Sequence, residues 1–472
     1  MEENIILYGE ITLAGFENLE IKKLTVTQEV NEHAHLNLYA RLAKEDEQNY
    51  IEAFNLNKAL KFIKDGKTLF VGLMRNFQVI TVQNVQHVNI DVISLTYLMD
   101  IDLRCRSFQN TDMSYDDVLE EVTDIKVYSK SIFTDNVSKG KKINKPIIQY
   151  METDWQFLKR LATHFNSVLI PNVRLDGPAF FFGIPSFGSD NLKLHNFTSI
   201  SNFERYRVLS TETPLIPFEC KSFETEVYKL YELGEKVIVN NITTHVGKTT
   251  YSYENSFIRN ICVFNIPAGL STIFAPNLNI AGSSIFGRVL AVARDRVKIH
   301  LDIDKDQPID EAFWYPYATM YASNDETGWY CMPEIDDVVR LYHPDGIEES
   351  AMLINSIKPH PTSTVENLPA NHRMANPDIK YFRTAFGKEL KLRPDGIDII
   401  AKDNTVFITL NDDGTMYFNS NDKISMTAVN DIEIKAKNVN IEAEEKIELK
   451  SKDGTLEMLE DIVVKGKEVR TN

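Results

Sequence analysis

The last part of the chain repeats short apolar pairs at a nearly constant step, and this repeat restricts the possible fold more than any other feature. The first members of successive pairs are 8, 7 and 8 residues apart. Within a pair the two residues are two positions apart, so both side chains point to one face of a strand. The pairs are Ile424 and Met426, Ile432 and Ile434, Val439 and Ile441, and Ile447 and Leu449.

A single chain cannot bury such a thin apolar stripe, because charged residues fill the space between the pairs. Residues 421–472 hold 9 Lys and Arg and 12 Asp and Glu residues. The repeat must therefore pack against copies of itself, which predicts a fibrous, trimeric rod. In a three-chain β-helix each chain supplies one strand per octad, with the pairs in a dry interior. At about 4.8 Å between strands, about ten octads would make a needle of roughly 50 Å.

Composition indicates a multidomain protein with packed cores. A chain of 472 residues predicts roughly three or four domains, and 43% hydrophobic residues suffice for their cores. The formal net charge of −17 disfavours nucleic acid and anionic membrane surfaces as main partners.

The cysteines and the N-terminal residues indicate the cellular compartment in which the protein is made. Cys105, Cys220, Cys262 and Cys331 are far apart in the sequence and form no CxxC pair, which predicts buried free thiols without disulfides or a zinc site. The acidic start, Met1–Asn4, lacks the positive region of a signal peptide, and no apolar run reaches about 18 residues. We expect synthesis and assembly in the cytoplasm, with any export performed by a machine.

Residues 1–100 show the β-branched alternation of strands. Asp65-Gly66 between two such runs predicts a hairpin. The expected strands are Asn4–Leu13, Lys23–Gln28, Ala34–Ala40, Leu60–Ile63, Thr68–Leu73 and Val88–Ile93.

Two helices have clear start signals. Ser114 precedes an acid three residues later, Asp117, and Thr153 and Gln156 form a capping box. The second helix continues with an apolar stripe from Trp155 to Phe165.

The second half of the chain divides at composition changes. Pro267–Gly282 is rich in turn residues, and the all-β segment that follows, to about Ile357, suits a five-stranded barrel of the OB type. Residues 358–378 read as a proline-rich, polar linker, and the repeat region begins near Phe386.

Three places in this order resemble the VgrG proteins of type VI secretion and the hub proteins of phage tails. The first is the helix entry Ile148–Leu161, similar to the family's "QY-E-D-FL-RL" pattern, with Arg106–Asn110 before it. The second is residues 281–357, which resemble the family's OB-fold domain, although Asp336 stands where the family has Gly and predicts an altered turn. The third is the C-terminal repeat, similar to the family's β-helix spike.

The resemblance implies a mainly β fold with a few helices, built as a homotrimer. The implied domains are a hub with phage-hub-like β-barrels over 1–275, an OB-fold over 280–357, a linker and neck over 358–385, and a triple-stranded β-helix over 386–472. The resemblance further implies a spike at the tip of a contractile injection system, a class that includes type VI secretion, phage tails, R-type bacteriocins and extracellular injection particles. The hub would dock on an inner tube of Hcp-like protein and on baseplate proteins.

Catalysis is not predicted. The sequence contains no GxSxG, HExxH or P-loop motif, and residues 358–385 are too short for a lysozyme-like domain. Asp and Glu mostly alternate with Lys on the expected strands, which is typical of a solvated face. We expect a protein that is not an enzyme and binds no cofactor.

Metal binding is not predicted either. His33 and His35 would share one strand face but have no third ligand nearby in sequence, which favours a structural role. Some spike tips of this family bind iron through an HxH motif, but no histidine follows His372. The resemblance then implies a blunt tip, and we expect Ile462, Val464 and Val469 to bind a PAAR-type tip protein or an effector.

Other functions remain as alternatives. An OB barrel can bind oligonucleotides, but this segment is not basic, and we expect its aromatic residues to serve the core or the trimer. A phage baseplate hub that degrades the cell wall is a second possibility. A β-solenoid that binds or cleaves polysaccharide is a third, although its coils need about 20 residues and the step here is eight.

Overall fold

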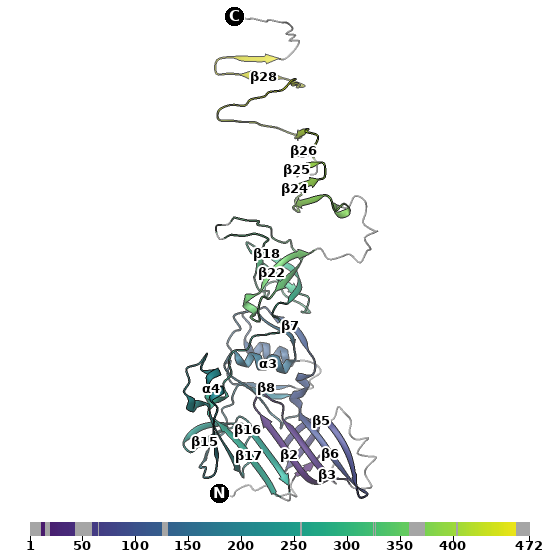
Figure 1. The fold of residues 1–472 in the computed structure, drawn as a ribbon. Helices are drawn as coiled ribbons and strands as arrows, with labels where there is room; N and C mark the ends of the chain where they lie inside the picture. The colour runs from purple at the N-terminus through teal and green to yellow at the C-terminus, as the bar shows by residue number, and fades with distance from the viewer. Residues whose placement is uncertain are drawn as a thin grey trace. The chain divides into compact units, whose positions relative to one another are not determined.

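The computed structural model describes residues 11–14, 19–42, 59–64, 66–124, 131–254, 257–323, 325, 327–357, 373–402 and 405–458. The fold is mainly β with a few helices, as predicted (Figure 1). The chain divides into two compact units, Met1–Pro359 and His360–Asn472, which are described separately.

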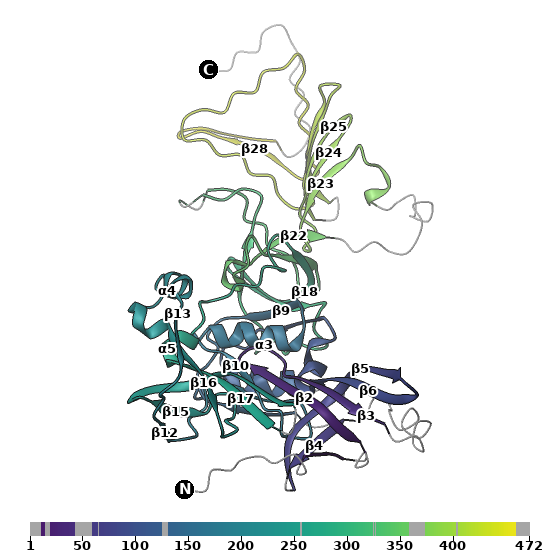
Figure 2. The same ribbon diagram turned by 60° about the horizontal axis from the view of Figure 1, so that its bottom comes forward.

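A twelve-stranded sheet, built from residues 11–94 and 190–265, forms one end of the first unit (Figures 1 and 2). Its main path is β1-β4-β5-β6-β3-β2-β16-β17-β14-β13, and β12 and β15 branch from β16. The strands are β1 (Ile11–Leu13), β2 (Glu20–Glu29), β3 (His35–Arg41), β4 (Leu60–Lys64), β5 (Lys67–Val82), β6 (Val85–Ser94), β12 (Asp190–Leu192), β13 (Thr198–Ser201), β14 (Lys221–Val227), β15 (Lys236–Val239), β16 (Ile242–Glu254) and β17 (Phe257–Asn265).

Alternating burial sets the faces of this sheet. Along β3, Leu36, Leu38 and Ala40 are fully buried, while the residues between them are not. The predicted hairpin is present, because β4 and β5 pair from Lys64 opposite Lys67. Of the predicted strand Asn4–Leu13, residues 4–10 lie outside the described residues.

A layer of helices and short strands lies between this sheet and the barrel (Figure 2). Both predicted capping boxes are confirmed: the Ser114 and Thr153 side chains accept from the backbone of Asp117 and Gln156, and the return bonds are present. The elements of this layer are η2 (Leu95–Asp100), β7 (Arg104–Phe108), α2 (Tyr115–Thr123), β8 (Ile132–Asp135), β9 (Ile147–Glu152), α3 (Asp154–Thr163), β10 (Leu169–Pro171) and β11 (Ala179–Phe182). Beside it, η3 (Pro217–Cys220) contacts α4 (Phe203–Leu209), β13 and α5 (Pro267–Leu270), and α5 contacts β16.

Five strands then close into a barrel in the order β18-β19-β20-β22-β21. β20 and β22 are parallel, and the other pairs are antiparallel, so the five-stranded OB-type barrel is present as predicted. Asp336 adopts a φ of 71°, the left-handed conformation that Gly takes without strain and that Asp tolerates. The elements are β18 (Ser284–Ala293), β19 (Arg296–Leu301), β20 (Tyr315–Ala318), β21 (Val338–Tyr342), η4 (Glu348–Ser350) and β22 (Met352–Ile357).

The four thiols are free, but only Cys220 and Cys262 are buried. The prediction of buried thiols is wrong for Cys331, which is exposed, and for Cys105, which is half-buried. Cys331 is the last residue of a hairpin that projects from the barrel, and the sequence around it does not reveal this position.

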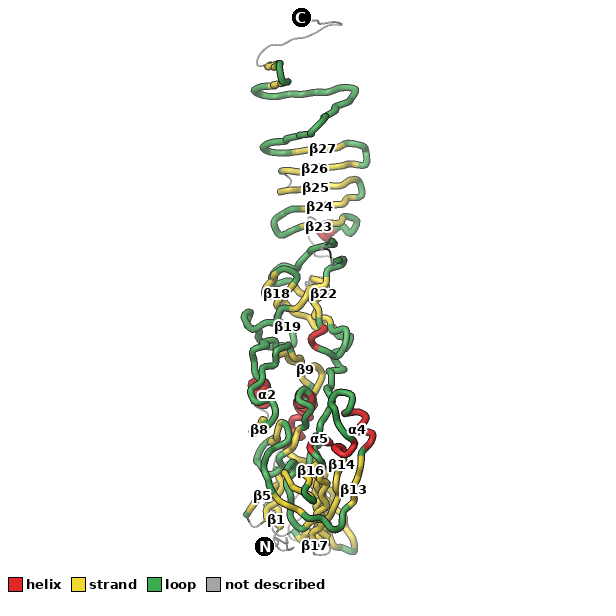
Figure 3. The backbone as a smooth tube through the Cα atoms, turned by 90° about the vertical axis from the view of Figure 1, so that its left-hand side faces the viewer, coloured by secondary structure: helices red, strands yellow, loops and turns green. Residues whose placement is uncertain are grey.

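The second unit begins with a five-stranded antiparallel meander, β23-β24-β25-β26-β27, whose strands lie one above the next (Figure 3). β23 lies within the segment predicted as linker and neck, and the predicted domain boundaries stay predictions. The elements are η6 (Arg373–Ala375), β23 (Lys380–Arg383), β24 (Glu389–Arg393), β25 (Gly396–Lys402), β26 (Val406–Asn411), β27 (Met416–Asn419), β28 (Ile447–Lys450) and β29 (Thr455–Met458).

Residues 420–446, all of them described, contain no strand. The strands expected at the pairs that begin with Ile424, Ile432 and Val439 are therefore absent from the single chain, and only Ile447 and Leu449 lie in a strand, β28. A strand requires a hydrogen-bonded neighbour, and the described residues supply none to this segment.

Candidate functional site

One face of the β23–β27 meander is apolar and open to solvent. Residues directly opposite one another in antiparallel strands share a face, and the register therefore collects one set of large apolar side chains. Their exposed fractions include 38% for Ile397 and 61% for Phe418. We call this set the needle face: Phe382, Leu390, Leu392, Ile397, Ile399, Ile408, Leu410, Met416 and Phe418.

The opposite face of the same sheet carries a hydrogen-bonded polar network. The Arg393 Nε atom donates to Asp398 Oδ2 at 2.9 Å, and the Thr409 hydroxyl donates to Asp398 Oδ1 at 3.0 Å. Arg393 also donates to Asn411 Oδ1 at 3.0 Å. This face satisfies its polar groups within one chain and is suited to water, so the needle face is the one that requires a partner.

The exposed apolar surface continues beyond the meander. A hollow of about 310 Å³ opens beside Ile408, Phe418 and Ile424. In the repeat that follows, Ile432 is 50% exposed and Ile434 is 71% exposed. Contiguous apolar surface of this extent is typical of an interaction site.

The sequence predicted the apolar repeat from Ile424 onward, but it was not used to predict the exposed apolar face of the preceding meander. Its signal is an alternation at a step of two, visible in Leu390 and Leu392 and again in Ile397 and Ile399. The predicted tip residues Ile462, Val464 and Val469 lie outside the described residues.

The His33-Ala34-His35 motif lies in the first unit. His33 precedes β3, so only His35 lies on the strand, and the expected shared strand face is absent. The His33 ring nitrogens lie 2.9 Å from the Thr96 hydroxyl and 3.2 Å from Asp100 Oδ2. These bonds give His33 a structural role.

Neither a metal-binding cluster nor a membrane-spanning helix is present in the ranges of the chain that the structure describes. Within them, no three His, Cys, Asp or Glu side chains gather in a way that could hold a metal ion. No helix within those ranges has the length and apolar character needed to cross a membrane.

A buried ion network ties the helical layer to the barrel. Arg160 on α3 bonds Glu152 Oε1 at 2.9 Å through Nε and Glu348 Oε1, in η4 of the barrel, at 2.8 Å through Nη1. The three side chains are 5%, 8% and 2% exposed, respectively. A second link between the helical layer and the barrel is a hydrogen bond from the Ser107 amide, in β7, to Asp304 Oδ1 at 2.6 Å. The network is fully paired and buried, which suits a rigid mechanical junction more than chemistry.

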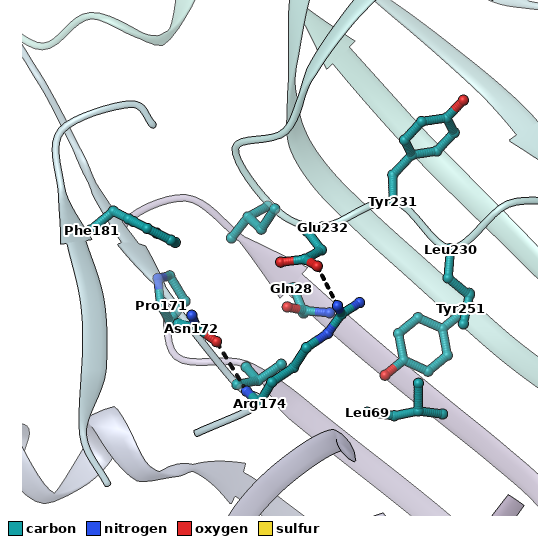
Figure 4. Close-up of a pocket in the computed structure, with 12 residues that line it drawn as sticks. Gln28, Leu69, Pro171, Asn172, Arg174, Phe181, Leu230, Tyr231, Glu232 and Tyr251 are labelled. Atoms are coloured by element: carbon teal, nitrogen blue, oxygen red, sulfur yellow. Dashed lines mark hydrogen bonds and ion pairs between the residues drawn. The ribbon is translucent and has the colours of Figure 1, made fainter. Parts of the chain in front are cut away.

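A small cavity lies beside an ion pair between Arg174 and Glu232 (Figure 4). Tyr251 and Gln28 also line it, and its volume is about 20 Å³. That volume holds about one water molecule, far below the several hundred Å³ of a ligand site.

Two buried histidines predict acid sensitivity of the first unit. Burial lowers the pKa of His343 to about 4, and burial, aided by the charge of Arg160, lowers that of His164 to about 3. The unfolded chain has a histidine pKa of about 6.5, so below that pH it binds protons that the folded chain excludes. Stability therefore falls as pH falls from about 6.5 toward 4, by about 2 kcal/mol per histidine at pH 5.

Thermal unfolding at pH 7.5 and pH 5.0 measures this loss. The double variant His343→Phe, His164→Phe is expected to lose less stability between the two pH values than the unmodified chain. The exposed His195 provides a control, and His195→Phe should leave the loss unchanged. An equal loss in the double variant would assign the sensitivity to other groups.

Known proteins resemble this chain in fold but not in sequence. No protein-family model and no curated protein matches the sequence. One similar solved structure is the E. coli c3393 protein, described as a component of the type VI secretion system with structural similarity to the T4 bacteriophage tail proteins gp27 and gp5. It is 12% identical with a TM-score of 0.52, and the match covers 74% of this chain and all of that one.

A second similar structure is the PdpA–VgrG complex of Francisella. It is 10% identical with a TM-score of 0.50, and the match covers 85% of this chain and 84% of that one. At such identities the likeness shows the fold alone. The chain has the fold of VgrG-like spike and phage-tail hub proteins, as the sequence motifs predicted.

Proposed function

We propose that the chain is a trimeric hub and spike at the tip of a contractile injection machine. The observation that carries this proposal is the needle face, a solvent-exposed apolar sheet face followed by residues 420–446, which form no strand with the described part of the chain. Two further copies would supply the missing partners and enclose the apolar side chains in a dry interior. The polar face of the sheet would then meet water.

In this proposal the role is mechanical. The hub docks on an inner tube of Hcp-like protein and on the baseplate, the barrel forms a collar, and the needle punctures the target envelope when the sheath contracts. Closed strand stacking leaves few free edges, which makes such a needle stiff. The fold shared with a type VI secretion component supports this role by analogy.

The remaining expectations belong to the same proposal. The protein is made and assembled in the cytoplasm and leaves with the tube, or as part of an extracellular particle. A PAAR-type protein or an effector sits at Ile462, Val464 and Val469. Neither nucleic acid nor catalysis is involved.

Localisation of the chain on intact particles tests the proposal. Cells that make the protein with an epitope tag would be imaged by cryo-electron tomography with gold-labelled antibody. We expect gold at one end of a sheathed tube. Gold that is never associated with tubes would contradict the proposal, and release of muropeptides from purified peptidoglycan by the chain would favour the wall-degrading alternative.

A further inference from the structure

A hairpin arm leaves the barrel between β20 and β21 and projects from it (Figure 2). Its described residues, 319–323, 325 and 327–331, are linked by backbone hydrogen bonds. The Trp329 amide donates to the carbonyl oxygen of Tyr321 at 2.8 Å, and the Ser323 amide donates to that of Thr327 at 2.9 Å. The arm therefore has a defined shape of its own.

The base of the arm and the close approach of its two sides are also fixed by specific contacts. The Tyr330 hydroxyl donates to the carbonyl oxygen of Arg294, in the turn between β18 and β19, at 2.8 Å. Gly328 has a φ of 139°, and a Cβ atom there would lie 2.3 Å from the Tyr321 carbonyl oxygen. Only glycine fits this position. The arm is thus a built feature, anchored to the barrel.

The side chains of the arm are large, apolar and exposed. Met320 is 94% exposed, Tyr330 is 73% exposed and Tyr321 is 56% exposed. Residues 319–335 include three acidic residues and no Lys or Arg, so the arm and its base are negatively charged. Aromatic side chains and Met are enriched at the centres of protein interfaces, which makes this arm suited to insertion against another surface.

A complementary surface lies on the outside of β18 and β21 in the same barrel. Phe286 is 42% exposed and pairs with Arg340, whose guanidinium lies 5.0 Å from the centre of the Phe286 ring. Arg288, also exposed, is the next outward residue on β18. Phe286, Arg288 and Arg340 together form an acceptor face that is basic and partly aromatic.

We propose that the arm of one copy lies on the acceptor face of the next copy in the trimer. The inference rests on the proposed threefold assembly and adds a second contact to it, at the collar. An acidic, aromatic arm and a basic, aromatic face attract each other through charge, cation–π and stacking interactions. The two surfaces differ, so the contact is heterologous, and three such contacts related by a threefold rotation close into a ring. A second copy is the occupant because one barrel carries both complementary surfaces.

Photo-crosslinking in the full-length chain tests this contact. A benzoylphenylalanine in place of Tyr321 should, on irradiation, yield covalent dimers and trimers in a denaturing gel. Peptide mass spectrometry should locate the cross-links at 284–288 and 338–342. The same probe at Tyr228, which is 72% exposed and outside both surfaces, should give no such product.

A matched pair of phenylalanine variants tests the acceptor. Phe286→Ser should lower the yield of covalent dimer about tenfold, the effect of losing an interface anchor. Phe203→Ser on α4, where the side chain is 58% exposed, should leave the yield unchanged.

The possible results test the arm contact and the trimer independently. A chain that is trimeric in solution but forms cross-links only within single copies, or none, overturns the arm contact and leaves the proposed function intact. A monomeric chain overturns both. Cross-links between copies at the acceptor face, reduced by Phe286→Ser, support the contact.

Discussion

Phe418→Asp is expected to convert the proposed trimer to monomers, whereas Tyr417→Asp leaves it intact. The two residues are neighbours in β27 and are similarly exposed in the single chain, at 61% and 56%. Phe418 lies opposite Ile408 on the needle face, and Tyr417 lies opposite Thr409 on the polar face. In an isolated chain both substitutions would be equally harmless.

The two variants are expected to differ only once three copies assemble. In the proposed trimer, Asp at 418 would place three unpaired carboxylates in a dry apolar interior, at a cost of several kcal/mol each. Asp at 417 would remain in water. Light scattering of both variants at equal concentration measures the outcome, and equal masses for the two variants would show that the needle face does not drive assembly.

Arg160→Met is expected to lower the free energy of unfolding of the first unit by about 3–5 kcal/mol, because it leaves two buried carboxylates without a counter-charge. Arg160 contacts both Glu152 and Glu348, which connect α3 and β9 to the barrel. Burial raises the pKa of Glu152 even though Arg160 donates to it. The loss in the variant should therefore be smaller at pH 5.0 than at pH 7.5, because protonation of the Glu152 carboxyl group removes its unpaired buried charge.

Urea unfolding followed by the fluorescence of the buried Trp155, on the same helix, measures this change. Arg259→Met is the matched control. Its pair with Glu226 is 2.9 Å long but lies on the surface, with side chains 63% and 46% exposed, so its loss should be far smaller than that of Arg160→Met. If the two variants lost the same stability, the buried network would not hold the hub to the barrel.

Local signals predicted the parts of the fold that depend on neighbouring residues. The capping boxes at Ser114 and Thr153 formed as expected, because each involves residues three positions apart. The hairpin at Gly66 and the five-stranded barrel also follow from short-range turns and alternation.

Features that depend on distant or absent partners were not predictable. In the large sheet, Val26 on β2 lies opposite Tyr251 on β16, a pairing that no local pattern reveals. The link from Arg160 to Glu348 is equally remote in sequence. The strands expected around Ile432 and Val439 are absent from the single chain, and in the proposed trimer their hydrogen-bonding partners would come from the other copies.

The most direct test of the central claim is the solution mass of the unmodified full-length chain by light scattering. The trimeric spike predicts a mass near three times 54.1 kDa, stable on dilution. A mass near 54.1 kDa at all concentrations would contradict it, because one chain alone leaves the needle face in water.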